Sequence, residues 1–394
     1  MPPKGARTPM VWKENRENAY CEITPAILAL KEQWEKKNYI DPKLYKEYNV
    51  KRGLRDEDGR GVLTGLTRVG EIQSYSVTEG EHIIPQDGML YYRGIDCREL
   101  VKGSEGRRFA FEETAYLLLF GELPTAAQLE AFCQQLASYR TLPTNFFRDV
   151  IMKAPPRDLM NTMQRGILTL FCYDDKPNDI GLENVLRQSL QLMSNMPVLA
   201  IYAYQAWRFS QGESLFIHVP KPELSTAENF LRMLREDCGY TDLEARTLDV
   251  ALILHADNGG GNNSTFTNHV VTSSGTDTYS AIAASMASLK GPRHGGANSK
   301  VMAMMDDVKE HVRDWNDEGC VADYLTRILN KDAFDRSGLI YGLGHAVYTK
   351  TDPRCEVFRA YVHHLAAEKG REDELALYAN VEKIGKQLLM ERQH

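Results

Sequence analysis

Long hydrophobic runs, closely spaced cysteines and a secretion signal are all missing from this sequence of 394 residues. The seven cysteines are scattered and none forms a Cys-x-x-Cys motif, which excludes a zinc ribbon and a thioredoxin-type redox site. The first twenty residues hold no apolar core of the signal-peptide kind, and the longest apolar stretch, 196–207, is too short to cross a bilayer. Since scattered single cysteines are typical of a reducing compartment, we expect a cytoplasmic protein with no membrane partner.

An excess of positive charge is also missing, because the formal net charge is −7. That balance argues against general nucleic-acid binding, although a local basic pocket for an anionic ligand is still compatible with it. Hydrophobic residues make up 43% and charged residues 26%, as in an ordinary globular protein with a large core. The length suggests two or three domains.

Helical periodicity dominates the chain after a short segment of a different kind. Residues 52–95 are rich in glycine and β-branched side chains and predict short strands or hairpins. Capping-box spacings at Ser225-x-x-Glu228 and Thr241-x-x-Glu244 each predict the start of a helix. The fold class we predict is therefore mainly α with a small β element near the N-terminus. Further helices are predicted over 21–37, 111–120, 125–140, 160–173, 182–208, 279–290, 300–312, 321–330, 356–368 and 374–391.

Three glycine-rich loops, each with one histidine, interrupt these helical patterns. They read LILHADNGGGNNSTF with His255, LKGPRHGGAN with His294, and YGLGHAVYTKTDPR with His345 and Arg354. Any one of these histidines alone would fit an ordinary helix C-terminus, where histidine interacts well with the helix dipole. Three loops of one form favour a ligand site, because glycine permits close backbone approach and histidine exchanges protons near neutrality.

Other site chemistries fit the sequence less well. It contains no H-E-x-x-H, G-x-S-x-G or P-loop motif. His255-x-Asp257 could begin a metal site only with a third ligand from far away, and the glycines at 259–261 follow a helix rather than a strand, unlike a dinucleotide fingerprint. We therefore expect no metal and no permanently bound cofactor.

The three loops resemble the signature loops of the citrate synthase family. Further stretches agree in the same order, namely GLTRVGEI, LYYRGID and FEETAYLLLFGELP, so the resemblance runs from about Gly53 to at least Arg354. It implies a mostly α subunit of two domains that works as a homodimer. By this resemblance the larger domain covers 1–296, with the small β segment at about 53–95, and the smaller one covers 297–394. The C-terminal return to the larger domain is not found in this sequence.

The resemblance also implies a reaction and a role for each matching residue. Acetyl-CoA or propionyl-CoA would condense with oxaloacetate to give citrate or 2-methylcitrate, with coenzyme A entering only as a substrate thioester. His294 matches the donor to the thioester oxygen, and His345 the acid that protonates the keto oxygen of oxaloacetate. Arg354 matches an arginine that grips an oxaloacetate carboxylate, and His255 a histidine beside that substrate. Lys350 is a candidate for the phosphates of coenzyme A.

Two departures from the family pattern keep a second interpretation open. Where the family usually has another histidine in contact with oxaloacetate, this sequence has Asn258, which donates a hydrogen bond but carries no charge. The family's catalytic aspartate lies in a motif like V-D-F-Y-S-G, and none occurs between Arg354 and His394. We expect the natural polypeptide to continue and to supply it. The alternative is a catalytically inactive homologue that binds or regulates.

Overall fold

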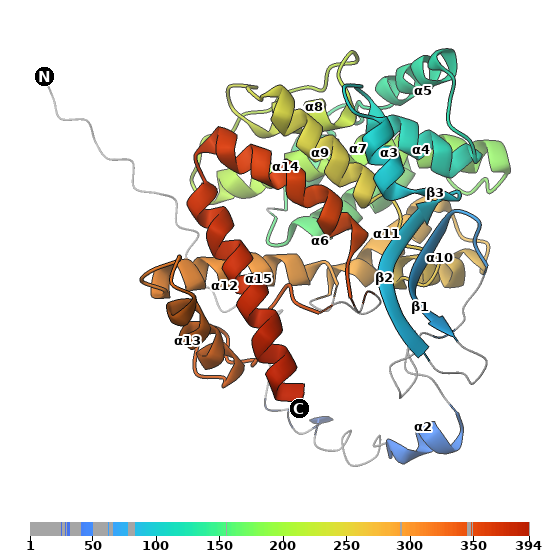
Figure 1. The fold of residues 1–394 in the computed structure, drawn as a ribbon. Helices are drawn as coiled ribbons and strands as arrows, with labels where there is room; N and C mark the ends of the chain where they lie inside the picture. The colour runs from blue at the N-terminus through green and yellow to red at the C-terminus, as the bar shows by residue number, and fades with distance from the viewer. Residues whose placement is uncertain are drawn as a thin grey trace, which may run out of the picture.

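A computed structural model shows a mainly helical molecule with one small sheet (Figure 1). It describes residues 25, 28, 30–31, 41–49, 62, 66–77, 83–154, 156–291, 294–344, 348 and 350–393. The sheet is antiparallel, with strand order β1-β2-β3. Its strands are β1 (Gly70–Val77), β2 (Ile83–Tyr92) and β3 (Ile95–Asp96). The predicted class, mainly α with a small β element near the N-terminus, is confirmed.

Helices occupy most of the remaining described residues. The α-helices are α2 (Lys43–Glu47), α3 (Cys97–Gly103), α4 (Ala110–Phe120), α5 (Ala126–Ser138), α6 (Leu159–Leu170), α7 (Leu182–Ser210), α8 (Thr226–Leu234), α9 (Asp242–Leu254), α10 (Asn263–Thr272), α11 (Thr278–Lys290), α12 (Gly296–His311), α13 (Glu318–Leu329), α14 (Pro353–Lys369) and α15 (Glu372–Gln393). A π-helix, η2 (Phe147–Met152), and a 3-10 turn, η3 (Phe171–Tyr173), complete the set. The helix expected over 21–37 lies outside the described residues, apart from a few positions that are helical.

Local capping determines where several helices begin. Both predicted capping boxes are present, at the start of α8 (Ser225) and of α9 (Thr241). Helix α14 begins three residues earlier than predicted, since Asp352 caps it and Pro353 needs no hydrogen-bond partner in a first turn. The sequence after His255 was predicted to be one loop, but its last residues form the start of helix α10, which Asn262 caps.

Strand β2 is the inward strand of the hairpin. Side chains alternate between the two faces of a strand, and on β2 the positions Gly88, Leu90 and Tyr92 are buried. Leu90 and Tyr92 join a hydrophobic cluster with α3, α4 and α9, against which Phe358 of α14 also packs. The hairpin therefore lies against α9 and α14 (Figure 1), the two helices next to two of the signature loops.

The C-terminal helices belong to two different hydrophobic clusters. One cluster joins α12, α13 and α15 through residues such as Met304, Leu325 and Leu377, and these helices lie together at one side of the molecule (Figure 1). Helix α14 instead packs against α9, α3 and β2. The division into domains 1–296 and 297–394 stays a prediction.

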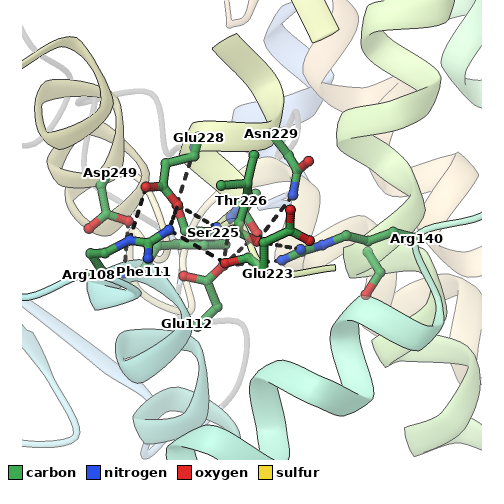
Figure 2. A network of polar contacts seen from close by, with 12 residues as sticks. Arg108, Phe111, Glu112, Arg140, Glu223, Ser225, Thr226, Glu228, Asn229 and Asp249 are labelled. Atoms are coloured by element: carbon green, nitrogen blue, oxygen red, sulfur yellow. Dashed lines mark hydrogen bonds and ion pairs between the residues drawn. The ribbon is translucent and has the colours of Figure 1, made fainter. Parts of the chain in front are cut away.

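A network of buried polar side chains ties α4, α8 and α9 together (Figure 2). Glu112 on α4 is fully buried and accepts hydrogen bonds from the N–H and hydroxyl of Thr226, at 2.7 and 2.8 Å. Arg140 lies 3.6 Å from the same carboxylate. Asp249 on α9 accepts a hydrogen bond of 3.2 Å from the N–H of Phe111 and so caps α4 from another helix.

Candidate active site

His255 lies at the C-terminal end of α9, as its loop pattern predicts. The side chain is exposed, and its Nδ1 lies 2.7 Å from the carbonyl oxygen of Ala251, one turn back. The backbone N–H of His255 donates to the same carbonyl. These contacts hold the ring at the helix end, with the other ring nitrogen directed away from Ala251.

The loop after His255 is pressed against strand β1. Asp257 accepts a 2.8 Å hydrogen bond from the N–H of Gly259, which closes a tight turn. A β-carbon added at Gly70 would lie 1.7 Å from Asp257 Oδ2, so only glycine leaves room for this carboxylate. Asn258 is partly buried, and its Oδ1 is buried with no hydrogen-bond partner among the described residues. That amide oxygen therefore favours a donor supplied by a ligand.

Arg354 is the second residue of α14 and is largely buried, with 17% of its side chain exposed. Its Nε and Nη2 donate to the two carboxylate oxygens of Asp352 at 3.0 and 2.7 Å. The guanidinium also lies 5.5 Å from the centre of the Tyr348 ring. Burial is the largest single influence and would lower the pKa of Arg354, but the hydrogen bonds to Asp352, together with the charges of Asp352, Tyr348 and Tyr92, outweigh it and raise that pKa. The site therefore holds a permanent cation.

His294 occupies an exposed turn between α11 and α12. Its N–H donates to the carbonyl of Gly291 at 3.0 Å, and its own carbonyl accepts from Ala297 in the first turn of α12. A β-carbon at Gly295 would lie 2.9 Å from the carbonyl oxygen of Leu289, so glycine lets the turn close tightly. The turn presents the His294 side chain to solvent.

His345 lies outside the described residues, and its role stays a prediction. Gly344 before it and Tyr348 after it are described. Gly342 approaches Val301 of α12, since a β-carbon there would lie 3.2 Å from the valine side chain. Thr351 accepts a 3.2 Å hydrogen bond from the N–H of Gly88 on β2. Lys350 is exposed beside it.

Tyr92 holds the His255 loop on strand β2, against which the helix of Arg354 also packs. Its hydroxyl donates to the carbonyls of Ile253 and Asp257, at 2.9 and 3.2 Å. Burial raises the pKa of Tyr92, and among the smaller causes the charge of Asp257 raises it while that of Arg354 lowers it. Tyr92 belongs to the sequence motif LYYRGID, but it was not predicted to be a site residue. Its place on the buried face of a predicted strand was the signal that could have identified it.

The His294 turn is linked to the same region. Asn263, in the first turn of α10, donates through its side-chain amide to the carbonyl of Ser288 at 3.3 Å. Ser288 belongs to the last turn of α11, just before the His294 turn. The ends of α9, α11 and α14 thus gather around the β1–β2 hairpin.

A cavity of about 690 Å³ lies elsewhere, beside the first half of α7. At its wall, Arg187 is already engaged by Asp174, Asn184 and Gln191. Within the described part of the chain, no group of three histidine, cysteine, aspartate or glutamate side chains could hold a metal ion. Over the same residues, no helix is long and apolar enough to span a membrane.

This arrangement defines a class of protein: a helical fold in which a glycine-rich histidine loop and the segment before a buried arginine rest on one strand, so that a fixed cation is available for an anionic ligand. The family described as citrate synthase, C-terminal domain, matches residues 60–394. The chain therefore belongs to the citrate synthase family, and the resemblance predicted from the sequence is confirmed.

Individual relatives agree with this assignment. A citrate synthase of Corynebacterium glutamicum is 31% identical over 304 residues, covering 75% of this chain and 65% of that protein. The 2-methylcitrate synthase 2 of the same organism is 30% identical over 340 residues, covering 84% and 78%. This chain thus spans just under two thirds of the first relative's length.

A solved structure supports the fold. Citrate synthase from Thermoplasma acidophilum, in a ternary complex with carboxymethyl coenzyme A and oxaloacetate, superposes with a TM-score of 0.69. The alignment covers 84% of this chain and 78% of the other at 23% identity. At that identity the likeness establishes the fold alone.

Proposed function

We propose that the protein joins the methyl carbon of an acyl-CoA thioester to the keto carbon of oxaloacetate and releases free coenzyme A. The observation that carries this proposal is that the His255 loop and the segment leading to Arg354 both rest on the inward face of β2, in a chain of this family. The ligands named for the Thermoplasma complex, a coenzyme A derivative and oxaloacetate, fit the same two-substrate reaction.

Arg354 supplies the fixed positive charge for oxaloacetate. Its planar fork matches a carboxylate, and Asp352 and Tyr348 hold it in one orientation before substrate arrives. His255 and Asn258 lie on the loop that faces this region from α9, and the unpartnered Oδ1 of Asn258 suits a hydroxyl or a protonated group. Together they bind and orient a small dicarboxylate.

The histidines act on the two reacting oxygens. When the methyl group of the thioester loses a proton, negative charge develops on the thioester oxygen, and His294 stabilises it by donating a hydrogen bond. The resulting enol carbon forms a bond to the keto carbon of oxaloacetate. His345 gives a proton to the keto oxygen, which becomes the hydroxyl of the product. Water then cleaves the thioester and frees coenzyme A.

The two aspartates nearest the loops are already committed to structural contacts. Asp257 accepts from Gly259, and Asp352 pairs with Arg354. We therefore do not assign the removal of the methyl proton to either of them. In the family this step belongs to an aspartate of the motif like V-D-F-Y-S-G.

The acyl chain is proposed to be acetyl or propionyl. One methylene changes discrimination by only about 1–3 kcal/mol, so use of both is compatible with one pocket. Relatives named citrate synthase and 2-methylcitrate synthase match the chain about equally, at 31% and 30% identity. Lys350, exposed next to Thr351, is available for a phosphate of coenzyme A.

We also propose a homodimer in a reducing compartment such as the cytoplasm. Apolar side chains are exposed on three neighbouring helices, with Leu168 on α6, Val270 on α10 and Leu289 on α11. Contiguous exposed apolar surface favours association. The described cysteines are all free thiols, which supports a reducing environment.

The full-length protein should release coenzyme A from acetyl-CoA or propionyl-CoA only when oxaloacetate is present, measured by chromatography of the free thiol. His294→Ala should lower turnover by roughly a hundredfold or more, the scale of one lost oxyanion donor. His364→Ala, an exposed histidine of α14, is the matched control and should keep wild-type turnover. Oxaloacetate binding without any CoA release by the wild type would favour a binding homologue instead. Wild-type turnover in the His294 variant would remove that residue from the mechanism.

A further inference from the structure

The hydroxyl of Tyr92 holds both ends of the turn that contains His255. Tyr92 is completely buried on strand β2. Its hydroxyl shares one proton between the carbonyl of Ile253 at 2.9 Å and that of Asp257 at 3.2 Å. These two carbonyls flank His255 in the chain. The Tyr92 hydroxyl is therefore one anchor of the His255 turn on the sheet, beside the close approach of Asp257 to Gly70.

Gly88, on the same face of β2, contacts the segment that precedes Arg354. A β-carbon at Gly88 would lie 2.3 Å from the carbonyl oxygen of Thr351 and 2.4 Å from Cδ1 of Tyr348. The N–H of Gly88 donates to Thr351 Oγ1 at 3.2 Å. Gly88 is not among the residues with positive φ, so glycine is needed here for space rather than for backbone conformation.

The two contact points share one rigid element. Residues 88 and 92 lie four positions apart on a strand, which is about 13 Å at 3.3 Å per residue. Residues 89–92 pair in register with β1, and Tyr91 and Tyr92 also pair with β3, whereas Gly88 lies at a β-bulge in the β1–β2 register. The inward face of the strand is closed by Leu90 in the core. Such a strand keeps a constant distance between the loops that rest on it.

We propose that the inward face of β2, through the Tyr92 hydroxyl and the bare backbone of Gly88, sets the separation of the His255 turn and Arg354 and so determines the affinity for oxaloacetate. Tyr92 and Gly88 are positioning residues, because they act through His255 and Arg354 rather than on the substrate itself. This inference rests on the function proposed above. It predicts that changes at either position weaken oxaloacetate binding, and that a change at Tyr92, which does not touch the segment of Lys350, leaves the interaction with the acyl-CoA unchanged.

Tyr92→Phe keeps the ring in the core and removes only the hydrogen bonds. The dissociation constant for oxaloacetate, measured by calorimetry, should rise by about tenfold, the usual effect of one lost hydrogen bond. The KM for oxaloacetate should rise with it, while the KM for acyl-CoA stays unchanged. Hydrogen exchange should accelerate for the amides of 255–261. Tyr91→Phe, on the opposite face of the same strand, is the matched control and should change none of these values.

Gly88→Ala tests the second contact independently. It should also weaken oxaloacetate binding by about tenfold or more, because the added carbon displaces the Thr351 carbonyl and the Tyr348 ring. Gly103→Ala is its control, since a β-carbon at Gly103 meets nothing within 4 Å. If the wild type binds oxaloacetate and both Tyr92→Phe and Gly88→Ala bind it equally well, the positioning role is overturned. If Tyr91→Phe weakens binding as much as Tyr92→Phe, the role is overturned too. A wild type that does not bind oxaloacetate instead overturns the proposed function.

Discussion

Arg354 shows how a single residue can be prepared for its substrate. A buried guanidinium is costly unless it is paired, and Asp352 pairs with it through two hydrogen bonds from its own helix start. Asp352 also caps α14 by accepting from the N–H of Arg354 at 3.0 Å. The same carboxylate therefore fixes both the helix end and the orientation of the cation.

Arg354→Ala should remove most of the affinity for oxaloacetate. Wild-type protein at a hundred times the dissociation constant gains about 2.7 kcal/mol of stability, seen as a higher melting temperature. Losing a charge-assisted bond of about 1.5–3 kcal/mol should abolish most of that rise at the same concentration. Arg359→Ala, an exposed arginine on the same helix that pairs with Glu382, should keep the full rise. An equal rise in both variants would exclude Arg354 from the oxaloacetate site.

Among the helices, α4 depends on a carboxylate from a different element. The residue before α4, Phe109, has a left-handed conformation and offers no side-chain cap, so Asp249 of α9 accepts the hydrogen bond from Phe111 instead. Burial, and after it the nearby Glu112 carboxylate, raise the pKa of Asp249 to about 7, against the smaller opposing effects of the hydrogen bond from Phe111 and the charge of Arg246. Asp249 thus prefers to be protonated in the folded state.

The raised pKa of Asp249 has a definite consequence for stability against pH. In the unfolded chain the carboxyl ionises near its usual value of 3.8, whereas in the folded protein it keeps its proton up to about pH 7. The contribution of protonated Asp249 to the free energy of unfolding is therefore fully present below pH 3.8. It is lost as pH rises toward 7, at about 1.4 kcal/mol per pH unit.

Asp249→Asn should remove this part of the pH dependence. Between pH 5 and pH 7 the wild type should lose about 2 kcal/mol more unfolding free energy than the variant, measured by urea titration. Asp242→Asn, an exposed carboxylate in the first turn of the same helix, should behave as the wild type. A wild type and an Asp249 variant with parallel pH profiles would contradict the assignment.

At the scale of the whole molecule, two separate hydrophobic clusters meet near the site. Helices α12, α13 and α15 form one, whereas α14 joins the core around β2 and α9. The segment before α14 therefore passes from one cluster to the other, next to Gly88 and Arg354. Such an arrangement suits closure of one part over a bound substrate, which would exclude water from the reacting enol.

The proposed dimer can be tested on its exposed apolar face. Leu168→Lys places a charge among the exposed side chains of α6, α10 and α11 and should convert the dimer to a monomer, measured by sedimentation equilibrium. Leu339→Lys, equally exposed between α13 and α14, should leave the dimer intact. A wild type that sediments as a monomer, or a Leu168 variant that stays dimeric, would contradict this face as the interface.

Local patterns were predictable from the sequence because they join residues that are near neighbours in the chain. The caps at Ser225 and Thr241 are hydrogen bonds between residues three apart, and both are present as predicted. Helical periodicity located α4, α5, α7, α11 and α13 for the same reason. The loop motifs were equally local, and they were enough to identify the family.

Only the tertiary structure decided the contacts between positions that are distant in the sequence. The Tyr92 hydroxyl meets carbonyls 161 and 165 residues away, and Asp249 caps a helix 138 residues before it. No periodicity or motif encodes such pairs, because they arise from how finished helices and strands pack against one another. The sequence therefore predicted the candidate residues for the chemistry, whereas packing on β2 decided how the His255 turn and the segment before Arg354 are held.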